Sequence, residues 1–102
     1  MMVKRLKERL ANYEIELKIF DINTDEEEIL SSYLDRLLIE KHKDNLSTSQ
    51  LNHLLELDKK AVDLYNKLKN NDTVAIEYLE RIVKEFALSN ITEYEKLHKK
   101  IA

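Results

Sequence analysis

The sequence predicts an all-α protein, a compact antiparallel bundle of four long helices plus a short C-terminal helix. Three observations lead to this prediction. Apolar residues recur along most of the chain at spacings of three and four, which is the period of a half-buried helix. The 102 residues include neither Gly nor Pro, so glycine-based hairpin turns and phosphate-binding glycine loops are excluded. Asparagine, the usual replacement for glycine at helix ends, stands wherever the helical period breaks.

These asparagines divide the chain into segments of helical length. The breaks fall at Asn23, at Asn45, at the pair Asn70 and Asn71, and at Asn90. Capping boxes are predicted after three of them, formed by Thr24 with Glu27, Ser47 with Gln50, and Asn90 with Glu93. The predicted helices span residues 3–22, 25–43, 48–69, 73–87 and 91–101. Short connections favour antiparallel neighbours, and one domain covers residues 1–102.

The first predicted helix carries apolar residues on two opposite sides. One stripe contains Met2, Leu6, Leu10, Tyr13, Leu17 and Phe20. The other contains Ala11, Ile15, Ile19 and Ile22. Residues two apart on a helix point about 200° apart, so two opposed stripes imitate the alternation of a strand over a short window. No other segment alternates with period two, and a lone strand would lack a partner, so we predict a helix.

One apolar face is enough to pack a helix onto a small bundle, so the second stripe needs another explanation. It meets another helix of the same chain, a second copy of the chain, or a different protein. Of these three interpretations, a contact between copies carries the functional prediction. We expect Ala11, Ile15, Ile19 and Ile22 to form, or to lie within, an interface, most simply in a homodimer.

The later helices show broader apolar faces. The second predicted helix places six apolar residues on one face: Ile29, Leu30, Tyr33, Leu34, Leu37 and Leu38. The third is apolar over about half of its circumference, and the fourth more broadly still, which places the fourth near the centre of the bundle.

Asp58 is the residue that least fits its surroundings. Helical spacing places it inside the apolar arc of the third helix, among Leu54, Leu55 and Val62. A buried carboxylate is costly unless it is paired or hydrogen-bonded, and Arg36 on the second helix is a plausible partner. A structural ion pair, a tyrosine contact and a role at an interface all remain open for Asp58.

Residues 82–101 resemble the helix-turn-helix segment of many DNA-binding regulators over about one fifth of the chain. Ala87 stands where the turn glycine is common, followed by Leu88 and Ser89, with Thr92 further on. Glu93 departs from the pattern because it replaces an apolar core residue and brings negative charge to a helix that would approach phosphate. The resemblance implies a DNA-binding regulator as the alternative function.

Composition limits the remaining classes. The chain has no Cys, which excludes disulfides, thiol nucleophiles and Cys-based zinc sites. Glu95 and His98 have the spacing of one helix of a di-iron bundle, but the further ligands are missing, so we expect no metal and no cofactor. No apolar run is long enough to cross a bilayer, and no signal peptide is read at the N-terminus, so a cytoplasmic location without a membrane partner is expected.

The predicted function is therefore non-enzymatic. We expect a small protein–protein interaction module, adaptor or regulator that self-associates through its first helix or binds another protein.

Overall fold

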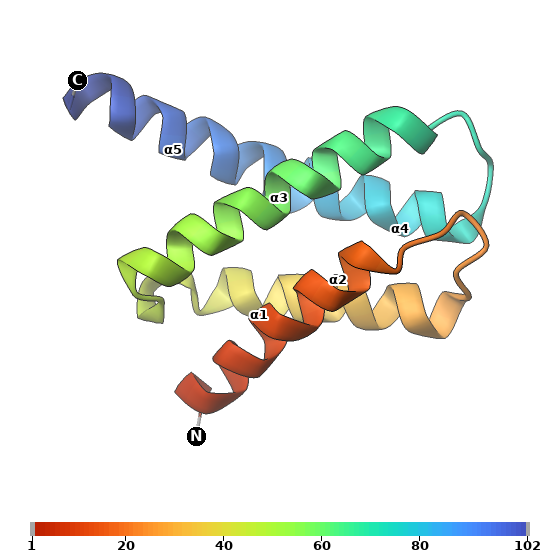
Figure 1. Cartoon of the computed structure of the whole chain (residues 1–102), viewed down its shortest axis with the longest axis horizontal. Helices are drawn as coiled ribbons and strands as arrows, with labels where there is room; N and C mark the ends of the chain where they lie inside the picture. The colour runs from red at the N-terminus through yellow and green to blue at the C-terminus, as the bar shows by residue number, and fades with distance from the viewer. Residues whose placement is uncertain (1, 102) are drawn as a thin grey trace.

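The computed structural model is an all-α bundle, described here for the backbone of residues 2–101 and for the side chains of residues 6–96 (Figure 1). Its helices are α1 (Met2–Lys18), α2 (Glu26–Lys41), α3 (Thr48–Leu68), α4 (Val74–Ile82) and α5 (Leu88–Ile101). A 3-10 turn, η1 (Lys43–Asn45), precedes α3, and a π-helical turn, η2 (Val83–Ala87), joins α4 to α5. Residues 2–101 contain no strand, so the predicted fold class is confirmed.

Helices α1 to α4 alternate in direction through a flat molecule, and α5 continues the direction of α4 (Figure 1). Its principal extents are 40 × 34 × 19 Å. Helix α1 packs on α2 and α3, α2 packs on α4, and α3 packs on η2 and α5. Within the part of the chain that the structure describes, no helix has both the length and the apolar character needed to span a bilayer.

The core lies between α1, α3 and α4. It is built from the stripe of α1 that spacing predicted, together with residues of α2, α3, α4 and η2. Its buried members are Leu6, Leu10, Tyr13, Leu17, Ile39, Leu46, Leu54, Leu57, Ala61, Leu79, Ile82 and Val83.

Several helices begin near the predicted positions, but the residues that cap them and the backbone conformation at their ends differ from the prediction. Ser47 and Gln50 form the expected capping box at the start of α3. Helix α2 is capped by Asp25, not by Thr24, and α4 by Thr73. The left-handed conformation expected for asparagine is not used, because no described residue has a positive φ. At the end of α3, Asn71 instead donates its side-chain amide to the carbonyl of Leu68 at 3.0 Å.

Helix α1 ends at Lys18, four residues before the predicted end, because the following residues form their own turn. Asp21 accepts a hydrogen bond from the backbone N–H of Asn23 at 2.8 Å, and its own N–H donates to Thr24 Oγ1 at 3.0 Å. Such side-chain bonds to the backbone compete with helical bonds and favour a turn. Ile19 and Ile22 therefore lie in the connection to α2 and not on a helix.

The predicted break at Asn90 is wrong. Helix α4 continues through η2 into α5 without a turn, so the predicted fourth and fifth helices are one. Asn90 is a buried residue inside this helix, and the capping box with Glu93 does not form. A helix-turn-helix motif requires two helices joined by a turn at a large angle. Residues 82–101 do not have that geometry.

The rotation of α2 also differs from the expected one. Its buried residues are Ile29, Ser32, Asp35, Arg36 and Ile39. Leu30 and Leu34, which we assigned to the core face, are exposed. Polar contacts described next fix this rotation.

Candidate functional site

A buried polar cluster occupies the point where the helices meet. Asp58 of α3 and Arg36 of α2 are both fully buried and form a bidentate pair, with Arg36 Nε 3.0 Å from Oδ1 and Nη2 2.9 Å from Oδ2. The Tyr13 hydroxyl of α1 donates to Oδ1 at 2.8 Å, and the Asn90 amide of α5 donates to Oδ2 at 2.9 Å. Each carboxylate oxygen thus accepts two hydrogen bonds, and one side chain is tied to three other helices.

The electrostatics of this cluster favour the ion pair. Burial disfavours the charged form of Arg36, but the neighbouring Asp58 carboxylate and its hydrogen bonds raise the Arg36 pKa above the usual value. Burial and the negative charge of Asp58 also raise the pKa of Tyr13, so its hydroxyl stays neutral and remains a donor. Arg36 has further partners in Glu40, at 3.0 Å from Nη1, and in the Phe86 ring, whose centroid lies 5.3 Å from Cζ.

The sequence pointed to only part of this cluster. The structure brings Asp58 and Arg36 together, and a tyrosine contact accompanies their ion pair. Asn90 was missed because it was interpreted as a helix end. An Asn that follows a π turn inside a continuous helix has no clear sequence signal, and only the packing of α5 on α3 places its amide beside Asp58.

The cluster is a structural clamp, by which we mean that hydrogen bonds and an ion pair to Asp58 hold α1, α2 and α5 against α3. Asp58 is closed to solvent and its lone pairs are occupied, so no reacting group can approach it. Among the described side chains, no group of three or more His, Asp or Glu residues is placed to hold a metal ion.

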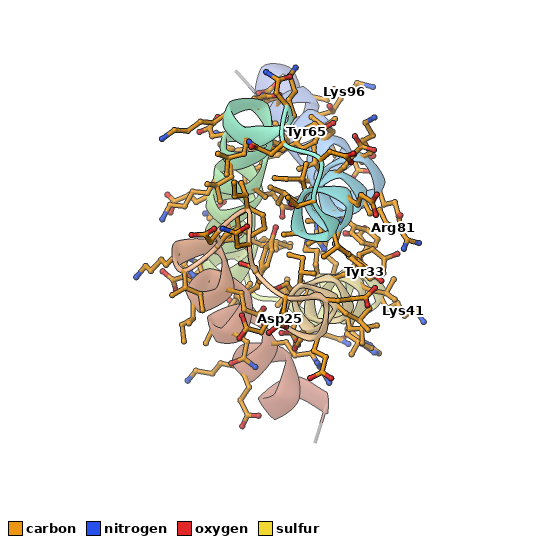
Figure 2. The ribbon with its side chains drawn as sticks, turned by 90° about the vertical axis from the view of Figure 1, so that its right-hand side faces the viewer. Asp25, Tyr33, Lys41, Tyr65, Arg81 and Lys96 are labelled. Atoms are coloured by element: carbon orange, nitrogen blue, oxygen red, sulfur yellow. The ribbon has the colours of Figure 1, made fainter. Side chains whose placement is uncertain are left out.

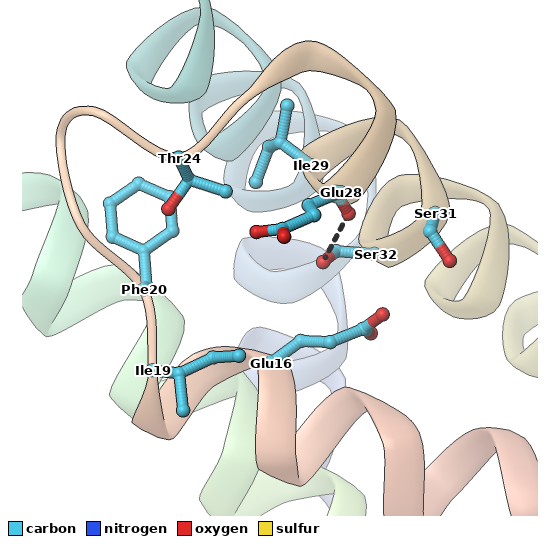
Figure 3. Close-up of a pocket in the computed structure, with 8 residues that line it drawn as sticks. All are labelled: Glu16, Ile19, Phe20, Thr24, Glu28, Ile29, Ser31 and Ser32. Atoms are coloured by element: carbon cyan, nitrogen blue, oxygen red, sulfur yellow. Dashed lines mark hydrogen bonds between the residues drawn. The ribbon is translucent and has the colours of Figure 1, made fainter.

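A second polar group lies between α1 and α2 and opens into a small cavity (Figure 3). The cavity has a volume of about 260 Å³ and is lined by Glu16, Ile19, Phe20, Thr24, Glu28, Ile29, Ser31 and Ser32. Glu16 extends from α1 on the side of α2 that carries the two serines (Figure 3). Partial burial, and then the carboxylate of Asp35, raise the pKa of Glu16 from 4.5 to about 8. Because this pKa lies above 7, Glu16 is mostly protonated at neutral pH. The neighbouring Asp35 pairs with Arg9 at 2.6 Å.

The predicted isoleucine stripe, Ala11, Ile15, Ile19 and Ile22, is not a single helix face. Ala11 and Ile15 lie on the outer side of α1, whereas Ile19 and Ile22 lie in the connection to α2, where Ile19 also lines the cavity. Ile15 is 54% exposed and Ile19 is 65% exposed, while Ala11 is exposed and Ile22 is half-buried. The opposite stripe of α1 is buried in the core. Another helix of this chain therefore does not cover Ile15 or Ile19 within the described residues, whereas the interface between copies stays a prediction.

Comparison of the chain with protein-family models, with curated proteins and with solved structures finds no match.

Proposed function

We propose that this chain is a small, non-enzymatic interaction module that self-associates through the isoleucine stripe of α1. The observation that carries the proposal is the exposure of Ile15 and Ile19, the two most exposed large apolar side chains in the described part of the molecule. Helix α1, which carries Ile15 and ends just before Ile19, already packs through its other face, so the fold itself does not require these two exposed side chains.

Energetics supports a contact at this place. Burying one isoleucine side chain completely contributes about 1.5–3 kcal/mol. A contact between two copies that covers Ile15 and Ile19 of each would therefore be stabilised by the burial of four isoleucines. Polar residues of α1 surround these isoleucines: Glu8, Asn12 and Lys18 are exposed. An apolar centre with a polar rim is the usual anatomy of a protein interface.

The DNA-binding alternative has no comparable support. Its motif depends on a turn near Ala87, where the chain is helical, and Glu93 and Glu95 are exposed on the helix that would face phosphate. The proposal therefore rests on protein contacts alone.

The test is to place charges in the stripe without changing the net charge. The variant Ile15→Glu with Ile19→Lys is expected to lower the molar mass in sedimentation across a range of concentrations, while circular dichroism shows unchanged helical content. A matched control, Asn66→Glu with Asn70→Lys, introduces the same charges at the same spacing on exposed positions around the end of α3 and should leave the mass unchanged. A wild-type chain that stays monomeric at high concentration would overturn the proposal.

A further inference from the structure

Helix α2 buries polar side chains beside two isoleucines and leaves leucines outside, which departs from the usual separation of apolar and polar faces. Its inner side holds Ser32, Asp35 and Arg36 together with Ile29 and Ile39, each buried. On the other side, Leu30 is 37% and Leu34 is 44% exposed. Leu37 and Leu38 are half-buried beside them. We call these four residues, Leu30, Leu34, Leu37 and Leu38, the leucine face.

The rotation of α2 agrees with its polar contacts and with the burial of Ile29 and Ile39, and not with its leucines. Arg36 must point inward to meet Asp58, and Asp35 must point toward α1 to meet Arg9. These two side chains set the angle of the helix about its axis, because residues on a helix keep a fixed angular spacing. The leucine face is what remains outside, and leucines so placed are a typical feature of an interaction surface.

A rim of aromatic and charged side chains borders the leucine face on the side of α4. Arg81 lies over the Tyr33 ring at 5.0 Å and over the Tyr78 ring at 5.7 Å, and it pairs with Glu85 at 3.3 Å. The Tyr33 hydroxyl also donates to Glu85 at 2.6 Å. Figure 2 shows Tyr33, Lys41 and Arg81 on one side of the molecule. Tyr and Arg are enriched in interfaces, and contacts of this kind hold them in place before a partner arrives.

The charges along the leucine face are arranged to fit a second copy. Glu27 is exposed about two turns before Leu34, and Lys41 is exposed about two turns after it. Glu27, Leu30, Leu34, Leu37 and Lys41 follow the alternating spacing of three and four that makes a helix–helix seam. A two-fold axis beside Leu34 would place an antiparallel α2 of the second copy with its lysine opposite Glu27 and its glutamate opposite Lys41.

We propose that the leucine face of α2 docks on the same face of a second copy, with the two helices antiparallel. Such a contact is isologous, because each surface meets itself. Parallel pairing would set Glu27 against Glu27 and Lys41 against Lys41, so the charge pattern selects the antiparallel arrangement. The inference shares self-association with the function proposed above but uses a different helix.

The experiment isolates this contact by working in the Ile15→Glu, Ile19→Lys chain, in which the α1 stripe is disabled. In that background the chain is expected to remain a dimer through α2 in sedimentation, smaller than a wild-type assembly that uses both contacts. Adding Glu27→Lys or Lys41→Glu alone should weaken the dimer about tenfold, because each change turns two attractive pairs into repulsive ones. The two changes together should restore the dissociation constant to within about threefold of the background, since the pairs are then reversed but intact.

Mixing the two singly changed chains is the sharper measurement. One carries lysine at both positions and the other glutamate at both, so they should form a heterodimer more tightly than either forms a homodimer. A further variant, Leu34→Glu, should give monomers, whereas Leu88→Glu, a similarly exposed leucine on α5, should not. Circular dichroism checks that each chain is folded.

The outcomes separate the two proposals. A background chain that is monomeric, or a charge swap that fails to restore binding, overturns the α2 inference and leaves the α1 proposal to its own test. If the α2 variants dissociate the wild-type assembly and the α1 variant does not, the α2 inference stands and the α1 stripe is not the interface.

Discussion

At the scale of single residues, Asp58 shows how a charge is kept inside a small core. Burying a carboxylate is costly, and here the cost is offset by a guanidinium in bidentate geometry and by two neutral donors, Tyr13 and Asn90. Because Arg36 is also fully buried, each charge depends on the other. Removing one partner is therefore worse than replacing both.

The first prediction concerns Asp58→Ala. It should lower the free energy of unfolding by about 3–5 kcal/mol, because Arg36 is left without its main buried partner. Asp63→Ala, an exposed acid on the same helix, should change it by no more than about 0.5 kcal/mol. The double variant Arg36→Met with Asp58→Leu should recover only part of the loss, because the buried charge is gone but Tyr13 and Asn90 lose their acceptor. Urea denaturation at matched protein concentrations measures all three, and a neutral result for Asp58→Ala would contradict the clamp.

Glu16 gives the prediction for pH. Its pKa is about 8 in the folded chain and near 4.5 when unfolded, so the folded state binds more protons between these values. The free energy of unfolding should therefore fall as pH rises from about 4.5 to about 8, with the full loss present above that range. Glu16 is only half-buried, so solvent screening limits the effect to the order of 1 kcal/mol.

The variant Glu16→Gln removes this titration. It should be more stable than wild type above pH 8 and equal to it near pH 4, as measured by thermal or urea unfolding over that range. The control Glu8→Gln, at an exposed position of α1, should keep the wild-type pH dependence. If Glu16→Gln shows an unchanged slope between pH 5 and 8, another group is responsible.

At the scale of elements, the π turn η2 decides what α5 presents to the bundle. A π turn is a one-residue expansion of an α-helix, and it rotates every later residue by about 100°. This rotation contributes to placing Asn90 next to Asp58, while Phe86 within the turn stacks on Arg36. The turn thus affects the buried cluster in two ways, through the position of Asn90 and through the contact of Phe86 with Arg36.

Deleting Lys84, an exposed residue of the turn, should return the segment to regular α-helix. Asn90 would then rotate away from Asp58, so the free energy of unfolding should fall by about 1–3 kcal/mol or more. Replacing the same residue, Lys84→Ala, keeps the chain length and should cost no more than about 0.5 kcal/mol. Equal unfolding midpoints for deletion and substitution would show that the turn has no such role.

At the scale of the whole molecule, the bundle is flat, and this shape determines what it offers to partners. Its extents are 40 × 34 × 19 Å, and the shortest of them is about two helix diameters, so many helices have one side in solvent. Among the described side chains, large apolar residues are exposed at three places: Ile15 and Ile19 near the end of α1, Leu30 and Leu34 on α2, and Leu88 on α5. The first two places hold more than one such residue, and both proposals above use them.

Helical periodicity and helix-start chemistry were sufficient to predict the fold class, the inner stripe of α1, the capping box of Ser47 and the need of Asp58 for a buried partner. These features depend on neighbours within one or two turns, so the local sequence determines them. The sequence also showed that Ile15 lies opposite Tyr13 on a helix, but it left open whether another helix of the chain covers it, and it extended the helix past Lys18 to include Ile19 and Ile22.

Only the tertiary structure decided the rest. Asn90 looks like a helix end in the sequence, and its amide becomes part of the core because α5 packs on α3 beside Asp58. The leucines of α2 look like a core stripe, and they lie outside because the inner side is taken by Arg36 and Asp35 with their partners and by Ile29 and Ile39. In both cases a contact between residues distant in the chain outweighs the local pattern, since leaving a buried charge unpaired costs more than exposing a leucine.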